Sequence, residues 1–227
     1  MKSPFLKLLG LFLLVAVIAI GVKIGVTNPF FSDTETSTNN ALSVADSFDP
    51  NPGDVVINEL MWMGSQGNAA DEWIELRNMT GSTIDLSGWK VVNLATGPGG
   101  TITIPSGKSI PPNGFFVIAN DDNDPQSTSA MIIIPNYFNS GVSLLDPGEQ
   151  LTLKDSSDNV IDTADNDGGG WFAGQNGAGP GVPEKSMERN STPGDGTVST
   201  NWHTASIQVN IDVGNREIAS PGAANSP

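Results

Sequence analysis

Short alternations of apolar and polar residues, separated by turn residues, make up most of the chain after its N-terminal segment. In residues 72–77 successive side chains alternate, which predicts a strand with Ile74 and Leu76 on its buried face and Trp73 on the opposite face. Residues 206–213 show the same period of two and predict another strand. Clusters of glycine, proline, asparagine and aspartate lie between such runs and are typical of turns. The pattern predicts an all-β domain without helices.

The first part of the chain has a different pattern. Residues 8–22 carry no charge and follow Lys2 and Lys7, which is typical of an export signal or a membrane-spanning helix. Pro29 disfavours cleavage after this segment, and the basic N-terminus favours an anchor that leaves the acidic remainder outside. Cleavage and anchoring both stay open. We expect residues 1–26 to form a hydrophobic signal or transmembrane helix.

The polar stretch of residues 27–53 is rich in serine, threonine, asparagine and aspartate and has no periodic apolar face, which predicts a flexible linker. Within it, residues 30–37 read Phe-Phe-Ser-Asp-Thr-Glu-Thr-Ser and resemble the leader junction of exported camelysin-type and biofilm-fibre proteins. The resemblance implies an exported protein of bacterial type. Cleavage near Phe30 would further imply a fibre subunit that donates its N-terminal strand to a neighbour.

Composition and charge exclude several functions. Aspartate and glutamate number 25 against 10 lysines and arginines, for a formal net charge of −15. An acidic surface without a stripe of basic residues repels a phosphate backbone, which excludes nucleic acid as a partner. The absence of cysteine excludes disulfides, thiolate metal sites and cysteine catalysis. His203 is the single histidine and no Gly-x-Ser-x-Gly motif accompanies it, so we predict no catalytic residue.

Three blocks of sequence carry a family resemblance. They are residues 57–59 (Ile-Asn-Glu), 71–76 (Asp-Glu-Trp-Ile-Glu-Leu) and 85–89 (Asp-Leu-Ser-Gly-Trp). In this order and spacing they resemble the lamin-tail domain family, and the similarity extends over residues 54–225. The resemblance implies an immunoglobulin-like β-sandwich of about eight to ten strands, here preceded by the N-terminal hydrophobic helix. Members of the family act as adhesive or positioning modules, and family enzymes carry their chemistry in a separate domain.

The resemblance also implies structural roles for residues of these blocks. It makes Glu59 and Glu75 ion-pair partners of an arginine. Arg77 and Arg189 are the candidates, and Asp71 would lie in a loop that caps the sheet. The complete set of structural-motif residues is Asn58, Glu59, Asp71, Glu72, Trp73, Glu75, Trp89 and Arg189.

Other interpretations of the same region stay open. Glycoside hydrolysis requires paired carboxylates, and the first two blocks supply an acidic cluster. Its members are Glu59, Asp71, Glu72 and Glu75. Tryptophans side by side on the surface would form a strip for carbohydrate stacking. We expect Trp62 and Trp89 to pack in the core instead, which leaves Trp73 as the exposed one.

Two acidic loops are candidate weak calcium sites, because calcium takes several oxygen ligands from flexible loops. The candidate ligands are Asp121, Asp122 and Asp124 in one loop and Asp162, Asp165 and Asp167 in the other. Neither loop follows the spacing of the EF-hand motif. Aspartate is also a common turn residue, so the alternative is a purely structural role. No other metal or cofactor is predicted.

These features predict a non-enzymatic module at the cell surface or in the medium, which binds or positions a protein or a cell-envelope polymer. The N-terminal segment would be its contact with the membrane. One alternative is an extracellular hydrolase that uses the acidic cluster, and another is a subunit of a surface fibre. Two carboxylates facing each other at the floor of a cleft would favour the hydrolase, whereas carboxylates paired with arginine would favour the module.

Overall fold

The computed structural model describes residues 50–94, 100–120, 131–166, 168–177, 181–212, 214 and 216–227. They belong to a compact unit that begins at Ser47. Several predicted features lie outside the described residues, namely the hydrophobic helix of residues 1–26, residues 27–49 of the linker, and the calcium candidates Asp121, Asp122, Asp124 and Asp167. Among the described residues, no helix is long and apolar enough to span a membrane.

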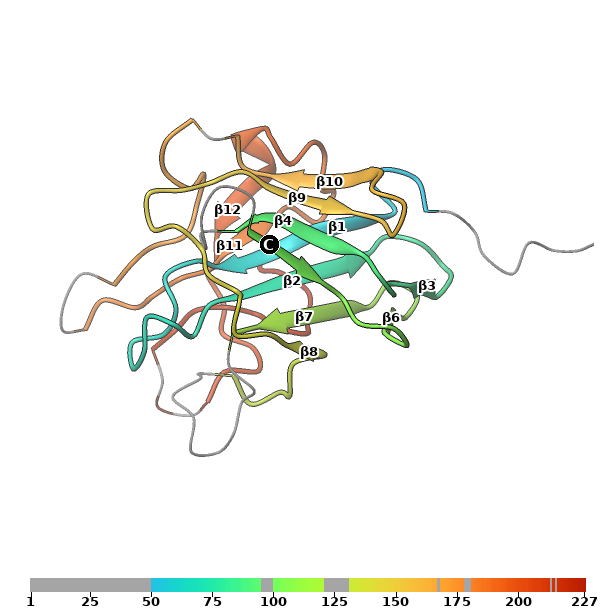
Figure 1. Ribbon diagram of the computed structural model, residues 1–227. Helices are drawn as coiled ribbons and strands as arrows, with labels where there is room; N and C mark the ends of the chain where they lie inside the picture. Colours follow the sequence, from blue (N-terminus) through green and yellow to red (C-terminus); the bar gives the residue numbers. More distant parts are fainter. Residues whose placement is uncertain are drawn as a thin grey trace, which may run out of the picture. The chain divides into compact units, whose positions relative to one another are not determined.

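The largest sheet has six strands in the order β12-β11-β1-β2-β7-β8 (Figure 1). Its strands are β1 (Val55–Met61), β2 (Trp73–Asn78), β7 (Phe115–Ala119), β8 (Tyr137–Phe138), β11 (Met187–Arg189) and β12 (Trp202–Thr204). Neighbouring strands are antiparallel except β7 and β8, which are parallel. Among the described strands, β8 and β12 therefore form the two edges of this sheet.

A second sheet has four strands in the order β10-β9-β4-β5, and two short strands form a separate pair. The strands are β4 (Lys90–Leu94), β5 (Gly100–Thr103), β9 (Leu151–Lys154) and β10 (Val160–Ala164), with β3 (Ile84–Asp85) paired to β6 (Ser109–Ile110). One turn of 3-10 helix, η1 (Ser199–Asn201), precedes β12. The all-β prediction is confirmed, with twelve strands in the described residues where about eight to ten were expected.

The core lies between the two larger sheets. Ile74 and Leu76 on β2 are fully buried, as is Leu153 on β9 of the other sheet. Apolar side chains at alternate positions give each strand a face that is removed from water, which is the main favourable term in folding. Trp62 and Trp89 also belong to the core cluster, as expected from the sequence.

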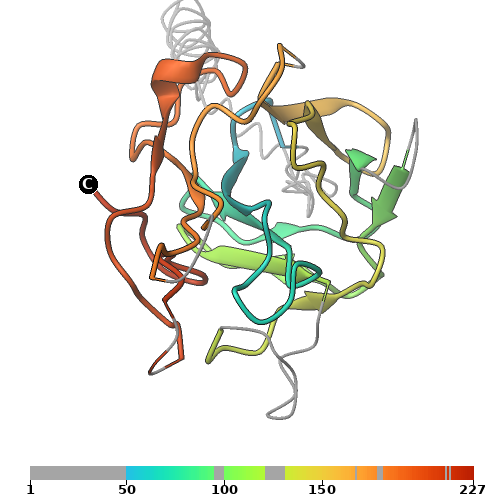
Figure 2. The same ribbon diagram turned by 90° about the vertical axis from the view of Figure 1, so that its left-hand side faces the viewer.

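The prediction of an exposed face on β2 is wrong, because both faces of this strand are buried. Trp73, expected to be exposed, shows 3% of its surface, and Glu75 shows none. The outer face is covered by the described part of residues 205–227, which we call the C-terminal layer. In Figure 2 this layer, in red, lies on one side of the cyan strands β1 and β2. The alternation predicted the strand correctly, but a third layer covers the side that was expected to face solvent.

The strand predicted at residues 206–213 is also wrong, as far as residues 206–212 show. These residues make one isolated bridge, between Ile211 and Met131. Asn210 has a φ of 56°, in the left-handed region that interrupts an extended strand. Its side-chain Nδ2 donates to the carbonyl oxygen of Pro221 at 2.8 Å. The alternating residues thus cover a sheet instead of extending one.

Candidate functional site

Three glutamates lie side by side on neighbouring strands of the six-stranded sheet. Glu59 on β1 is the register partner of Glu188 on β11 and of Glu75 on β2. Directly paired residues of antiparallel strands point to the same face. All three side chains are fully buried. We call them the glutamate row. Glu188 was not among the site residues predicted from the sequence, because only the strand order β11-β1-β2 brings it next to Glu59.

Glu59, at the centre of the row, is held by two serines. Ser186 Oγ donates to Glu59 Oε1 at 2.6 Å, and the backbone N–H of Ser220 donates to the same oxygen at 2.9 Å. Ser220 Oγ lies 3.0 Å from Glu59 Oε2 and 2.9 Å from Glu188 Oε1. Ser220 belongs to the C-terminal layer, so this layer is hydrogen-bonded directly to the sheet that it covers.

The two outer members of the row have their own partners. Glu75 accepts from Asn58 Nδ2 at 2.8 Å and from the backbone N–H of Gly222. Glu188 Oε2 accepts from the backbone N–H of Ser226 at 3.0 Å and from its hydroxyl group. The same oxygen lies 3.0 Å from His203 Nε2 on β12. In each of these contacts, hydroxyl or N–H donors surround carboxyl oxygens that lie out of reach of solvent.

Burial changes the acidity of the row. Burial and, to a lesser extent, the nearby Glu188 carboxylate raise the pKa of Glu59 from 4.5 to about 8, against the opposing hydrogen bonds of Ser186 and Ser220. Burial and the neighbouring Glu59 hold the pKa of Glu75 well above its usual range. A carboxyl group in such a place is more stable with its proton than without it. At neutral pH the row therefore retains protons.

Arg189 pairs with Asp162, not with Glu59 or Glu75 as expected. Arg189 Nη2 lies 3.3 Å from Asp162 Oδ1, and the arginine side chain is fully buried. Asp162 lies on β10, so the pair joins the two larger sheets. Arg189 therefore occupies the inner face of β11, and adjacent residues of a strand point to opposite faces. This geometry explains why Arg189 cannot reach the row on the outer face.

Arg77, the other arginine considered, also makes no ion pair with the row. Its Nη1 lies 3.5 Å from the carbonyl oxygen of Ser191, and its guanidinium lies over the Phe115 ring at 5.8 Å. Among the described residues, the ion pair of the row is the one between Glu188 and His203, which is charged only when the histidine is protonated. The row is thus without a lysine or arginine partner in the part of the chain that is described.

Asp71 and Glu72 do not join the row. Asp71 accepts from Ser65 Oγ and, at 3.1 Å, from Asn68 Nδ2, within the loop that precedes β2. Glu72 accepts from the backbone N–H of Leu144 at 3.1 Å. Burial raises the pKa of Glu72 to about 8. The acidic cluster expected from the sequence is therefore divided among separate sites.

Two of the calcium candidates lie in the described residues. Asp162 is the partner of Arg189. Asp165 is buried and accepts from the backbone N–H groups of Asn166 at 2.6 Å and Phe172 at 3.0 Å. Within the described ranges, no group of three or more histidine or acidic side chains is placed to hold a metal ion. Calcium binding by the acidic loops stays a prediction, because most candidate ligands lie outside those ranges.

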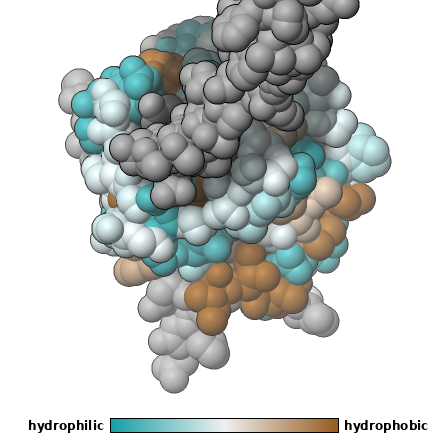
Figure 3. Space-filling model, turned by 90° about the vertical axis from the view of Figure 1, so that its right-hand side faces the viewer, coloured by the Kyte–Doolittle hydropathy of each residue, from teal (hydrophilic) through white to brown (hydrophobic). Residues whose placement is uncertain are grey.

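An exposed apolar patch lies beside the edge strand β8. It consists of Ile132, Ile134 and Phe138, which expose 58%, 81% and 46% of their surfaces. Figure 3 shows an apolar area, in brown, along the lower margin of the molecule, the margin where Figure 1 places β8. Among the described strands, only β7 pairs with β8. We call these three residues the β8 patch.

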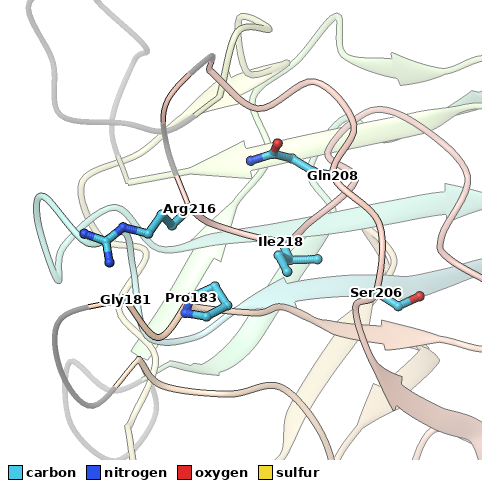
Figure 4. Close-up of a pocket in the computed structure, with 6 residues that line it drawn as sticks. All are labelled: Gly181, Pro183, Ser206, Gln208, Arg216 and Ile218. Carbon is cyan, nitrogen blue, oxygen red and sulfur yellow. The ribbon is translucent and has the colours of Figure 1, made fainter.

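A pocket of about 370 Å³ opens on the C-terminal layer (Figure 4). Its lining residues are Gly181, Pro183, Ser206, Gln208, Arg216 and Ile218. In Figure 4 the guanidinium of Arg216 points away from Ser206. The lining contains neither histidine nor carboxylate, so these residues do not pair a nucleophile with a base.

Comparison with known proteins agrees with the fold. The sequence model of the Lamin Tail Domain family matches residues 49–167. This range contains the three sequence blocks and β1 to β10, while β11, β12 and the C-terminal layer lie beyond it. No individual curated protein was found to match the chain. Because the matched range covers more than half of the chain and its described part forms an all-β sandwich, this chain belongs to the lamin tail domain family.

Proposed function

We propose that this protein is a non-enzymatic lamin tail domain module that binds a protein partner through the β8 patch. The observation that carries the proposal is the exposure of Ile132, Ile134 and Phe138 beside an edge strand. Contiguous exposed apolar side chains mark interaction sites, and an edge strand accepts an extended segment of another chain. The net charge of −15 favours a segment whose apolar residues are flanked by neutral or basic ones.

The buried carboxylates support binding over hydrolysis. A glycosidase places two carboxyl groups about 5–10 Å apart on either side of a substrate. Glu59 and Glu75 are fully buried and are hydrogen-bonded by the chain itself. His203 contacts Glu188, Asn190 and, at 3.3 Å, the hydroxyl group of Ser226, but Ser226 is buried and its hydroxyl group donates to Glu188. Among the described residues, the acidic groups thus stabilise the sandwich.

The proposal also places the module outside the cytoplasm. Residues 8–22 supply an uncharged apolar segment behind a basic N-terminus, as an export signal or membrane anchor does. The partner would then be a protein of the cell envelope or its surroundings. A cell-envelope polymer and a neighbouring copy in a fibre are the alternatives that the experiment must distinguish.

The test measures saturable binding of the labelled full-length chain to cells that produce the protein. The double variant Ile134→Asp, Phe138→Asp should bind at least about tenfold more weakly, because a carboxylate buried in an apolar contact has no partner. Val198→Asp is the matched control, since Val198 is 43% exposed and lies next to η1, near the opposite edge of the sheet. Its binding should equal that of the wild type.

Three outcomes would contradict the proposal. They are wild-type binding by the double variant, an equal loss of binding by Val198→Asp, and binding that protease treatment of the cells does not reduce, which would indicate a polymer. Hydrolysis of cell-wall polysaccharide that disappears in Glu59→Gln would instead establish the hydrolase.

A further inference from the structure

The hydroxyl group of Ser220 joins two carboxyl groups of the glutamate row. Ser220 Oγ is 3.0 Å from Glu59 Oε2 and 2.9 Å from Glu188 Oε1. A hydroxyl group has a single hydrogen, and an ionised carboxylate only accepts. If both glutamates were ionised, one of these two short contacts would place oxygens together without a hydrogen between them. The geometry therefore requires a proton on one of the two carboxyl groups.

The ring of His203 lies beside Glu188 and not beside Glu59. Asn190 Nδ2 donates to the carbonyl oxygen of Thr200 at 2.9 Å, which turns Asn190 Oδ1 toward His203 Nδ1 at 3.0 Å. On the other side of the ring, Nε2 lies 3.0 Å from Glu188 Oε2. The Ser226 hydroxyl lies 3.3 Å from the same nitrogen. Glu188 thus has a histidine beside it that can donate to it, whereas no lysine, arginine or histidine of the described residues pairs with Glu59.

With the proton on Glu59, the hydroxyl group of Ser220 has a donor on one side and an acceptor on the other. Glu188 Oε1 then accepts the hydroxyl hydrogen of Ser220, and the Glu59 carboxyl group donates its own hydrogen to Ser220 Oγ. The result is a chain of two hydrogen bonds, in which Glu59 donates to Ser220 and Ser220 donates to Glu188. Its central member, Ser220, belongs to the C-terminal layer.

No further cation is placed to stabilise the row if it loses its protons. The other charged or titratable side chains on the strands and the C-terminal layer packed against it are Arg77, Arg189, His203, Asp212, Arg216 and Glu217, with Glu184 and Lys185 just before β11. Arg189 is on the opposite face of β11 and pairs with Asp162. Arg77 directs Nη1 to the Ser191 carbonyl oxygen, and Glu217 Oε1 accepts from the backbone N–H of Gln66 at 2.7 Å. Among the described residues, the charged partner of the row is His203 alone.

We propose that residues 217–227 form a proton-dependent C-terminal latch, which is closed over the glutamate row while Glu59 is protonated and opens when the row ionises. Deprotonation sends the Glu59 proton to solvent and leaves Ser220 one hydrogen short. It also places unpaired negative charges side by side in a site without water contact, which is costly until the cover leaves. Opening would uncover the row.

The latch has hydrogen bonds that are independent of the row, such as those from the Ile218 N–H to the Glu184 carbonyl oxygen at 2.9 Å and from Asn225 Nδ2 to the Arg189 carbonyl oxygen at 2.7 Å. Several of its other contacts depend on the row. Besides Ser220, the backbone N–H groups of Gly222 and Ser226 donate to Glu75 and Glu188. The raised pKa of Glu59, about 8, places the transition just above neutral pH. A folded-state pKa above the unfolded value gives stabilisation that is complete below about pH 4.5 and is lost as the pH rises through about 8. The inference does not depend on the β8 patch.

The experiment is hydrogen–deuterium exchange of the full-length chain, read by mass spectrometry and corrected for the intrinsic pH dependence of exchange. Between about pH 6 and about pH 9 we expect protection of residues 217–227 to fall at least about tenfold more than protection of β9 and β10. In Glu59→Gln the side-chain oxygen can accept from Ser186 and Ser220 while its NH₂ group donates to Ser220 Oγ. This variant mimics the protonated state and should keep the latch closed at both pH values.

Glu72→Gln is the matched control. Burial raises the pKa of Glu72 to about 8 as well, but its hydrogen bond goes to Leu144 and not to the latch. This variant should keep the wild-type pH dependence of residues 217–227. The proposal is overturned if the latch stays protected at the higher pH, if β9 and β10 lose protection in parallel with it, or if Glu72→Gln removes the effect as Glu59→Gln does. If a variant fails to fold, the pH dependence of protection in the wild-type chain, compared between residues 217–227 and the strands β9 and β10, still tests the proposal.

Discussion

At the scale of single residues, the chain buries charge in two different ways. Arg189 and Asp162 form a pair between the sheets, in which burial lowers the pKa of Arg189 and raises that of Asp162 while each partner opposes the shift of the other. The glutamate row instead keeps protons. A buried pair depends on both members, because removal of one leaves an uncompensated charge.

Replacement of Arg189 tests this dependence. Arg189→Met would leave Asp162 buried alone and the carbonyl oxygens of Pro193 and Gly194 without the donors that now lie at 2.7 and 2.8 Å. We expect the free energy of unfolding to fall by about 3–5 kcal/mol, measured by urea denaturation. Arg77→Met is the control and should cost about 1 kcal/mol or less, because Arg77 Nε already lacks a partner among the described residues. An unchanged midpoint for Arg189→Met would contradict the pairing.

Glu72 gives a pH dependence with a defined sign. Its pKa of about 8 in the folded state exceeds the ordinary value of 4.5, so the folded state binds the proton more tightly than the unfolded state does. The stabilisation is complete below about pH 4.5 and is lost as the pH rises through about 8. We expect the urea midpoint to fall between about pH 5 and about pH 9, and to fall less in Glu72→Gln. A midpoint that rises over this range would refute the assignment.

At the scale of elements, sequence periodicity identified strands but not what lies on each of their faces. The alternation in β2 is real, yet the C-terminal layer buries the side that carries Trp73 and Glu75. The alternation in residues 206–212 is also real, yet Asn210 interrupts the extended conformation. A period of two indicates that the two faces of a strand differ. Which part of the chain packs on each face is determined by residues far away in the sequence.

The loop before η1 packs closely against the Arg189 site, and this predicts a specific sensitivity. A Cβ atom at Gly196 would overlap the carbonyl oxygen of Thr163 and Nη1 of Arg189. We expect Gly196→Ala to lower the melting temperature clearly, by the equivalent of about 1–3 kcal/mol for an overpacked site. Gly81→Ala should leave the melting temperature nearly unchanged, since a Cβ atom there meets nothing within 4 Å. Equal effects of the two substitutions would contradict this packing.

At the scale of the whole molecule, the domain extends beyond the range that the family model matches. β11 and β12 lie after residue 167, and β11 pairs with β1, the first strand of the sandwich. A chain shortened to residues 49–167 would lose this pairing and would expose Glu59, Glu75 and Trp73. We expect it not to fold cooperatively, as judged by a broad thermal transition in circular dichroism, because β1 would become an unprotected edge strand. A sharp transition near that of the full chain would contradict this expectation.

We predict from the sequence that the N-terminal segment anchors the protein in a membrane. We expect the intact mass of the protein, recovered from membrane and medium fractions of the cells that make it, to be that of the full chain in the membrane. Retention follows from Pro29, which disfavours cleavage, and from the apolar length of residues 8–22. A mature species that begins near Phe30 in the medium would instead indicate cleavage and would favour the fibre alternative.

The sequence by itself determined the all-β class, the strand that carries Ile74 and Leu76, and the family, because side-chain alternation and turn residues are local properties. Only the tertiary structure decided that Arg189 pairs with Asp162, that Glu188 joins Glu59 and Glu75, and that the end of the chain covers them. These relations depend on strand order and on contacts between residues more than a hundred positions apart, such as Glu59 and Ser220. Local patterns carry no information about such long-range neighbours, and burial, not residue type, sets the proton affinity of the row.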